Sequence, residues 1–159
     1  MKLDLDRQEG GRSELGIEGD LELGLKDGRP ARARITGVLV VQNMESRFLL
    51  SGRLEAAGEA ECGRCLATCD VVWPVPVDIM VLRNVDTDED QGETLLIQQR
   101  KGEVDLAPAL SECAVLGFPQ APVCSADCRG LCPGCGIDRN RETCSCADDD
   151  FDPRWEGLP

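Results

Sequence analysis

Cysteine is the residue type in this sequence whose number and spacing could do chemistry. Eight of the ten cysteines fall into four close pairs. These pairs are Cys62/Cys65, Cys124/Cys128, Cys132/Cys135 and Cys144/Cys146. A zinc ion prefers four soft ligands at about 2.3 Å in a tetrahedron. Eight thiols are enough for two such sites, so the sequence predicts two zinc ions.

The run C-P-G-C-G at residues 132–136 is the most specific of these patterns. Two cysteines separated by two residues can face one ion if the chain between them turns tightly. Pro133 and Gly134 favour that turn, and Gly136 follows where a positive φ is often needed. The C-x₃-C and C-x-C pairs are weaker signals, which gain their value from the crowding of residues 124–146.

Other chemistries of paired thiols remain open at this point. An iron–sulfur cluster also takes four thiolates, a disulfide framework needs an oxidising compartment, and buried cysteines can be free. The chain has no histidine. Histidine is therefore excluded as a metal ligand, and so are Ser-His-Asp and Cys-His catalytic groups.

Charge and hydropathy indicate the setting in which the protein works. The net charge of −13 argues against broad, non-specific RNA binding and favours a basic partner such as a ribosomal protein. No stretch reaches the roughly 18 apolar residues of a membrane span. The acidic N-terminus has no apolar signal region, so we expect a cytoplasmic protein, in which paired cysteines favour metal over disulfide.

A local basic patch could still meet RNA phosphates or a partner protein. The candidate contact residues are Arg129, Arg139, Asn140, Arg141 and Trp155. Guanidinium groups beside the cysteines suit phosphate oxygens. The alternative is that these arginines pair with nearby acids such as Asp127, Asp138 and Glu142. Trp155 is expected to dock on the body of the chain, on the metal module or on a partner.

The rest of the chain predicts an α+β fold that positions the cysteines. Residues 1–119 should form a mainly antiparallel β body with one helix, and residues 120–159 a Cys-rich zinc-knuckle tail packed on it. Period-two alternation predicts strands from Asp20, at 33–41, at 47–55 and at 71–82, arranged as an antiparallel β-meander or small barrel. The residues before Asp20 are interpreted as a short edge strand and a polar stretch.

Two details of this layout bear on the site. Cys62 and Cys65 should lie at a hairpin tip, and prolines at 74 and 76 predict an edge position or a bend in the last long strand. A helix should begin after Asp105 as its N-cap and end near Gly117. Its buried face is expected to carry Leu106, Ala109, Leu110, Cys113, Leu116 and Gly117.

Several of these motifs together resemble the YceD-like proteins, the large ribosomal RNA subunit accumulation proteins. The resemblance runs from about Cys62 to Leu158 and is carried by C-G-R-C-L, by C-S-A-D-C-R-G-L-C-P-G-C-G-I-D-R-N, by C-S-C and by D-P-R-W. It implies a protein that is needed for normal accumulation of large-subunit ribosomal RNA and has no assigned enzymatic activity. It implies no small-molecule substrate, and ribosomal protein or ribosomal RNA as the partner.

The resemblance also implies how the eight thiols divide. Some members keep C-x-R-C and a His/Cys pair at the positions of Cys124 and Cys128 while lacking the last cysteines. One ion would then take Cys62, Cys65, Cys124 and Cys128, and the other Cys132, Cys135, Cys144 and Cys146. The second set is short enough to close its own knuckle. The alternative is a single site that uses Cys124 or Cys128 with the last four cysteines and leaves Cys62/Cys65 unpaired.

Two classes of function follow from the sequence. The first is a non-catalytic ribosome-biogenesis factor with structural zinc. The second is a thiol redox or metal-relay protein that uses Cys62/Cys65, which requires a titratable thiol pair of lowered pKa. A zinc hydrolase is disfavoured, because all-cysteine sites are usually closed.

Overall fold

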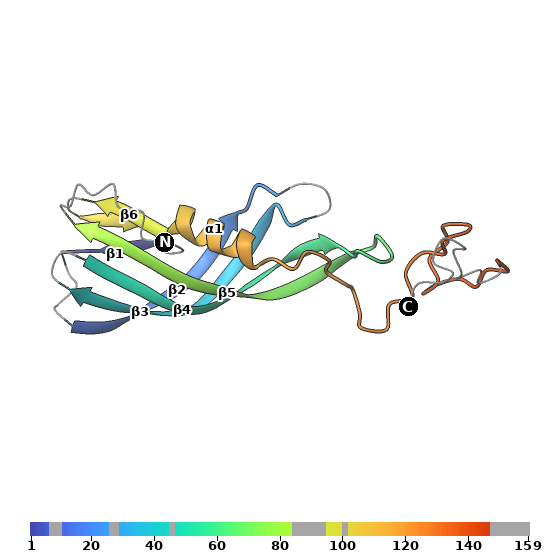
Figure 1. The fold of residues 1–159 in the computed structure, drawn as a ribbon, viewed down its shortest axis with the longest axis horizontal. Coiled ribbons are helices and arrows are strands. Elements are labelled where there is room, and N and C mark those ends of the chain that lie inside the picture. Colours follow the sequence, from blue (N-terminus) through green and yellow to red (C-terminus); the bar gives the residue numbers. More distant parts are fainter. Residues whose placement is uncertain (7–10, 26–28, 45–46, 84–94, 100–101, 147–159) are drawn as a thin grey trace, which may run out of the picture.

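The computed structural model describes residues 1–6, 11–25, 29–44, 47–83, 95–99 and 102–146. Its main feature is a five-stranded sheet in the order β2-β3-β4-β5-β6 (Figure 1). The strands are β2 (Gly11–Glu22), β3 (Arg32–Met44), β4 (Arg47–Glu61), β5 (Thr68–Arg83) and β6 (Leu95–Gln99). The first four form an antiparallel meander, and β6 runs parallel to β5. The predicted α+β class and the meander are confirmed.

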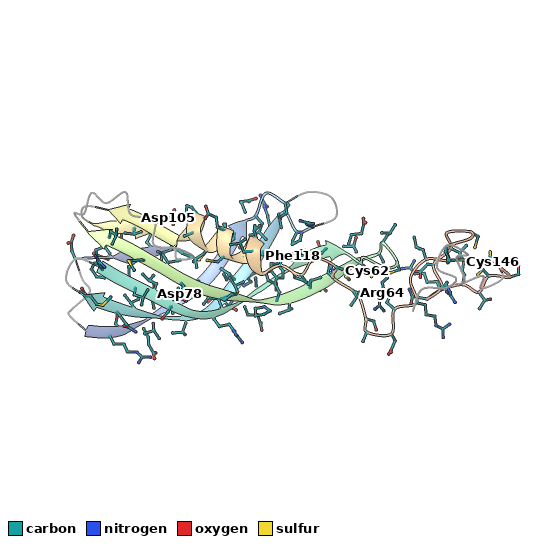
Figure 2. The ribbon with its side chains drawn as sticks, viewed as in Figure 1. Cys62, Arg64, Asp78, Asp105, Phe118 and Cys146 are labelled. Carbon is teal, nitrogen blue, oxygen red and sulfur yellow. The ribbon has the colours of Figure 1, made fainter. Side chains whose placement is uncertain are left out.

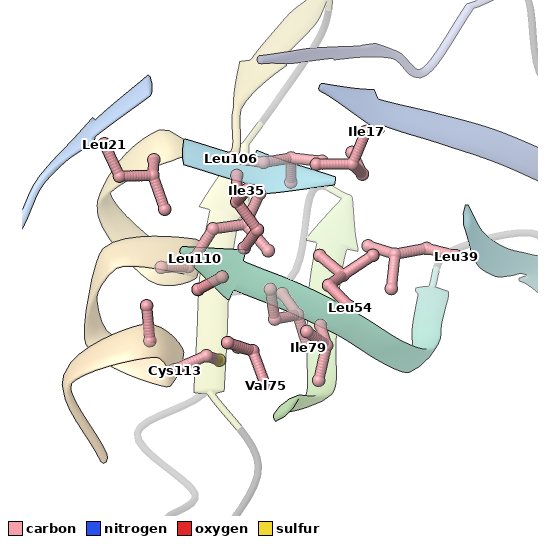
Figure 3. Close-up of a cluster of buried hydrophobic side chains, with 14 of the residues drawn as sticks. Ile17, Leu21, Ile35, Leu39, Leu54, Val75, Ile79, Leu106, Leu110 and Cys113 are labelled. Carbon is pink, nitrogen blue, oxygen red and sulfur yellow. The ribbon is translucent and has the colours of Figure 1, made fainter. Parts of the chain in front are cut away.

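The sheet is open, so the expectation of a small barrel is wrong. Its apolar face is instead covered by α1 (Ala107–Gly117) and by a second sheet of β1 (Lys2–Asp4) and β7 (Glu103–Asp105). A layer on one face of a sheet buries apolar side chains without strand closure. Figure 3 shows this core, in which Leu106 and Leu110 face Ile35 and Ile79, all four fully buried.

Trp73 fixes the helix against the sheet. Its side chain on β5 is 2% exposed, and its indole Nε1 donates a hydrogen bond to the carbonyl oxygen of Ala114 at 3.0 Å. Its ring meets Phe118 edge-to-face, with centroids 5.0 Å apart. A buried indole N–H that finds its acceptor combines apolar burial with a fixed orientation. The chain therefore leaves α1 in a defined direction, toward the end of β5 that begins at Thr68 (Figure 1).

The N-terminal part departs from expectation, because residues 11–22 are one long strand. The predicted polar stretch before Asp20 is wrong there. β2 lies at the sheet edge with one face to solvent, where polar residues are tolerated. Two cross-strand ion pairs to β3 support this strand. The Arg34 Nη2 atom lies 2.6 Å from Glu18 Oε1, and the Arg32 Nε atom lies 2.6 Å from Glu22 Oε1.

The helix lies where it was predicted, but Leu116 is 82% exposed, Gly117 is only half-buried, and the prediction of Asp105 as the N-cap is wrong. Ala114 takes the buried place in the last turn instead. Leu106 occupies the N-cap position, while the Asp105 carboxylate one residue earlier accepts a hydrogen bond from the Ala107 N–H at 3.0 Å. The apolar face is therefore narrower than a simple reading of the spacing suggests.

The prolines of β5 lie where the strand has one described strand neighbour. Pro74 and Pro76 pair with β4, and β6 joins β5 only from Ile79 onward. Proline has no N–H to donate, so an edge position suits it. The end of α1 lies close to this stretch, because Gly117 approaches the carbonyl oxygen of Pro74.

Gly117 provides a test of this packing. A Cβ there would lie 2.8 Å from the carbonyl oxygen of Pro74, a backbone atom that cannot swing aside. Overpacking costs about 1–3 kcal/mol, which exceeds the roughly 1 kcal/mol that alanine gains over glycine in a helix. We expect Gly117→Ala to lower the free energy of unfolding in chemical denaturation. The neighbouring control Leu116→Ala should change it by less than about 0.5 kcal/mol.

Candidate metal centres

The β4–β5 hairpin carries the first two cysteines to one end of the molecule. Figure 1 shows this hairpin reaching beyond α1 toward the Cys-rich segment, residues 121–146. Its turn is closed by two backbone hydrogen bonds, from the Cys62 N–H to the Ala67 oxygen at 2.9 Å and from the Leu66 N–H to the Cys62 oxygen at 2.9 Å. Cys62 and Cys65 therefore lie at the hairpin tip, as predicted.

Arg64 attaches the Cys-rich segment to this tip (Figure 2). Its guanidinium donates to the carbonyl oxygen of Cys128 at 3.1 Å, and its own carbonyl oxygen accepts from the Leu131 N–H at 2.9 Å. The next contact is the Gly63 N–H on the Pro122 oxygen at 2.8 Å. Gly130 is required opposite Arg64, because its φ is +70° and a Cβ there would lie 2.9 Å from the Arg64 oxygen. The two chain segments thus meet without a regular sheet.

The first cysteine group consists of Cys62, Cys65, Cys124 and Cys128. Its four sulfurs all lie within 4.8 Å of one another, with 3.9 Å between Cys62 and Cys128 and 3.7 Å between Cys65 and Cys124. Metal–sulfur bonds of about 2.3 Å in a tetrahedron place sulfurs about 3.8 Å apart. Three of the four residues are buried, and Cys124 is exposed.

The charges of the first cysteine group are unevenly stabilised. Burial raises the pKa of the Cys62 thiol, but backbone N–H groups, including those of Arg64 and Cys124 at 3.4 Å, lower it to about 6. The neighbouring thiols of Cys128 and Cys65 raise the pKa of Cys124 to about 12. Four thiolates this close repel one another unless a cation lies among them. The group is therefore suited to a soft divalent ion.

The second cysteine group consists of Cys132, Cys135, Cys144 and Cys146, whose sulfurs also lie within 4.8 Å of one another. Cys144 and Cys132 are 3.4 Å apart. The turn is held by hydrogen bonds from the Cys132 N–H to the Ile137 oxygen and from the Gly136 N–H to the Cys132 oxygen, both 2.8 Å. Gly136 has φ +76°, which confirms the expected positive φ.

The same uneven stabilisation recurs in the second cysteine group. The backbone N–H groups of Cys135 and Gly134 lower the pKa of the Cys132 thiol to about 6. The thiols of Cys135 and Cys132 raise the pKa of Cys146 to about 12. Cys135 and Cys146 are exposed, so this group is more open to solvent than the first cysteine group.

The structure therefore divides the eight sulfurs into the two sets of four that the resemblance implied. It does not form the single site that would leave Cys62/Cys65 unpaired. All ten cysteines are free thiols, and each set can hold one metal ion. Cys69 is half-buried beside the first cysteine group and Cys113 is buried in the main core, and neither belongs to a set.

The predicted partner-contact residues have different surroundings. Arg141 lies 3.5 Å from Asp138, so it has the acidic neighbour considered in the sequence analysis. The Asn140 side chain is engaged within the protein, where it accepts from the Arg129 N–H at 2.8 Å. Arg129 and Arg139 line a hollow of about 330 Å³ beside the second cysteine group. Trp155 lies outside the described residues.

Sequence reasoning missed Arg64 as the residue that joins the hairpin tip to the Cys-rich segment. Its place inside C-G-R-C, between two predicted ligands, was the available signal. Among the described residues, no helix has the length and apolar character needed to cross a membrane.

Comparison with known proteins gives one family and several relatives. The family model for the large ribosomal RNA subunit accumulation protein YceD matches residues 50–159. Uncharacterized proteins of Mycobacterium tuberculosis and Mycobacterium bovis are each 30% identical over 121 residues, covering 76% of this chain. An uncharacterized protein of Mycobacterium leprae is 28% identical over 128 residues. The chain spans 58% of the length of the first two relatives and 55% of the third. No solved structure matches it.

Proposed function

The chain belongs to the YceD family of large ribosomal RNA subunit accumulation proteins, and on that premise we propose that it is a non-catalytic, zinc-binding ribosome-biogenesis factor. It supports the accumulation of large-subunit ribosomal RNA in the cytoplasm. The observation that carries this proposal is the family match over residues 50–159, which includes both cysteine groups.

Zinc, when bound, supplies a cross-link between chain segments and neutralises part of the thiolate charge. Cys62, Cys65, Cys124 and Cys128 would hold one ion, and Cys132, Cys135, Cys144 and Cys146 the other. All eight donors are thiols, which is the ligand type of structural zinc. The chain's own residues do the rest: backbone N–H groups stabilise the thiolates, and Arg64 aligns the two segments.

The site favours an adaptor over an enzyme. A catalytic zinc keeps one coordination position for water and has a general base nearby. Here each candidate metal site has four thiols, enough to fill a tetrahedral coordination shell. The chain also has no histidine. The end of the molecule that carries both cysteine groups would therefore serve as a rigid surface for a partner.

We propose a basic ribosomal protein as the direct partner, because the net charge of −13 favours basic surfaces. Direct contact with precursor RNA is the second version of the same function. Arg129 and Arg139, which line the hollow beside the second cysteine group, favour that version.

The function is tested in bacterial cells that lack their own family member. Expression of this chain should restore the ratio of large-subunit to small-subunit ribosomal RNA, and a Cys62→Ser/Cys132→Ser chain should not. Unchanged ratios with the wild-type chain, at matched protein levels, would contradict the proposal.

The two partner versions are separated by titration of large-subunit precursor RNA in a filter-binding assay. At low salt, direct RNA binding predicts retention that weakens in an Arg129→Glu variant and with rising salt. Absence of binding even at low salt would leave the protein partner, which is then sought among purified basic ribosomal proteins.

A thiol redox or metal-relay role is favoured by the backbone N–H groups of Arg64 and Cys124, which lie 3.4 Å from the Cys62 sulfur and lower the pKa of its thiol to about 6. Cys62 is completely buried, however, and a relay needs a thiolate that a partner can reach. The thiol count described in the Discussion separates this role from structural zinc.

A further inference from the structure

Asn140 lies in the Cys-rich segment between Cys135 and Cys144. Its side chain contacts Arg129 and Cys128, which precede the second cysteine group in the chain. Its side-chain oxygen accepts a hydrogen bond from the Arg129 N–H at 2.8 Å. This contact fixes which way the amide points, because only the oxygen can accept. The amide nitrogen then faces Cys128 and Asp138.

The Asn140 amide nitrogen donates to the sulfur of Cys128, a member of the first cysteine group, at 3.5 Å. Asn140 itself belongs to the loop that the second cysteine group closes, between Cys135 and Cys144. The hydrogen bond therefore crosses from one group to the other. A donor to a thiolate sulfur favours its charged, metal-binding form.

Asp138 determines where Asn140 lies. Its carboxylate accepts from the Asn140 backbone N–H at 2.9 Å and from the side-chain nitrogen at 2.7 Å. Asp138 pairs with Leu131 in an isolated β-bridge, and the adjacent Ile137 accepts from the Cys132 N–H. The position of Asn140 thus depends on the turn that the second cysteine group holds.

We propose that Asn140 is a positioning residue that couples the two metal centres, so that an ion in the second centre slows the loss of the ion in the first. This inference rests on the proposed metal centres. The coupling is reciprocal by thermodynamic linkage, so an ion in the first centre also favours retention in the second. The two ions then load and leave together rather than independently.

The test is the release of zinc from loaded protein into an excess of a coloured chelator. The wild-type protein should release its two ions together in one slow phase, because the ion in each centre slows the loss of the other. Asn140→Asp keeps the oxygen that accepts from Arg129 but replaces the donor to Cys128 with a carboxylate. Loss of an outer-shell partner costs about 10–100-fold in metal affinity. We therefore expect the slow phase to speed up by at least about tenfold.

The matched control is Arg141→Gln, one residue along, which changes the net charge by the same amount. Arg141 is 77% exposed and its ion pair with Asp138 is a surface one, which contributes little. Its slow phase should stay within about twofold of the wild-type rate. An equal acceleration in both variants would mean a general charge effect and would overturn the role of Asn140.

A second comparison uses Cys135→Ser/Cys146→Ser, which removes the second centre and does not depend on the folding of the Asn140 variant. The remaining first-centre ion should leave faster than the slow phase of the wild type, and adding Asn140→Asp should change its rate no further. Release at the wild-type slow rate would overturn the coupling while leaving two proposed centres. A wild-type protein that binds no ion at all would overturn the centres themselves.

Discussion

Chelation of the bound metal is expected to expose eight thiols and to release the Cys-rich segment from the hairpin tip, while the β body stays folded. Apart from the hydrogen bonds to Gly63 and Arg64, little apolar burial holds the described part of the segment to the tip. Among the described residues, the buried cluster outside the main core consists of Cys62, Cys65 and Cys128, with Ala67 and Cys69 packed alongside. Structural zinc contributes about 10–16 kcal/mol of apparent binding free energy in small domains. In the part of the segment that the structure describes, no comparable apolar burial replaces it.

The body should survive because it has its own core, which includes Trp73, Phe48 and the apolar face of α1. A thiol reagent added to native, metal-loaded protein should modify at most Cys69 quickly, since Cys113 is buried in that core. After chelation about eight more thiols should react. Limited trypsin digestion should then cut at Arg129, Arg139 and Arg141 and spare the sheet.

Two outcomes would contradict this prediction. If the thiols of Cys62 and Cys65 react fully before chelation, the pair is free and the redox or relay role gains support. If circular dichroism shows loss of the β signal together with the segment, the body and the metal centres fold as one unit.

The cysteine chemistry could be predicted from sequence because its information is local. The spacing of pairs such as Cys132/Cys135 predicts that both thiols bind the same metal ion, and Gly136 predicts the turn. The division into two groups needed more than spacing, because Cys62 is separated from Cys128 by 66 positions. The resemblance supplied that division, and the structure brings the same sulfurs together.

The meander was predictable for the same local reason, since β3, β4 and β5 alternate apolar and polar residues. The failures all depend on tertiary context. β2 is polar on its outer face and is stabilised across the sheet by Arg32 and Arg34. Leu116 has the right spacing for a buried helix face but is 82% exposed.

The contacts that join the two centres could not be read from the sequence. Arg64 and Asn140 are ordinary polar residues until the fold brings a carbonyl oxygen or a thiol sulfur within reach. Asn140 as a partner contact stays a prediction; within the protein, its side chain accepts from the Arg129 N–H and faces Cys128. Polar residues between ligands can thus organise a centre as readily as they face a partner.

Replacing Cys62 with serine is expected to have the largest effect of any single substitution. A hydroxyl is a poor substitute for a thiolate on a soft ion, so native mass spectrometry should count one ion in place of two. The lost cross-link joins positions 59 to 66 residues apart. In the chain-entropy model a closed loop of this length stabilises a fold by about 4 kcal/mol. We expect chemical denaturation to show a loss of that order.

Cys69→Ser is the matched control, because Cys69 is half-buried beside the same cluster but belongs to neither group. It should keep two ions and lose no more than about 1 kcal/mol, the typical effect of a single substitution. If Cys62→Ser also keeps two ions, the first centre does not use Cys62, and the hairpin tip is not joined to the Cys-rich segment through metal. If instead Cys69→Ser loses an ion, the ligand set of the first centre includes a fifth thiol that the geometry leaves out. The two variants therefore decide, at one position each, whether the sulfurs brought together by the fold are the ones that bind.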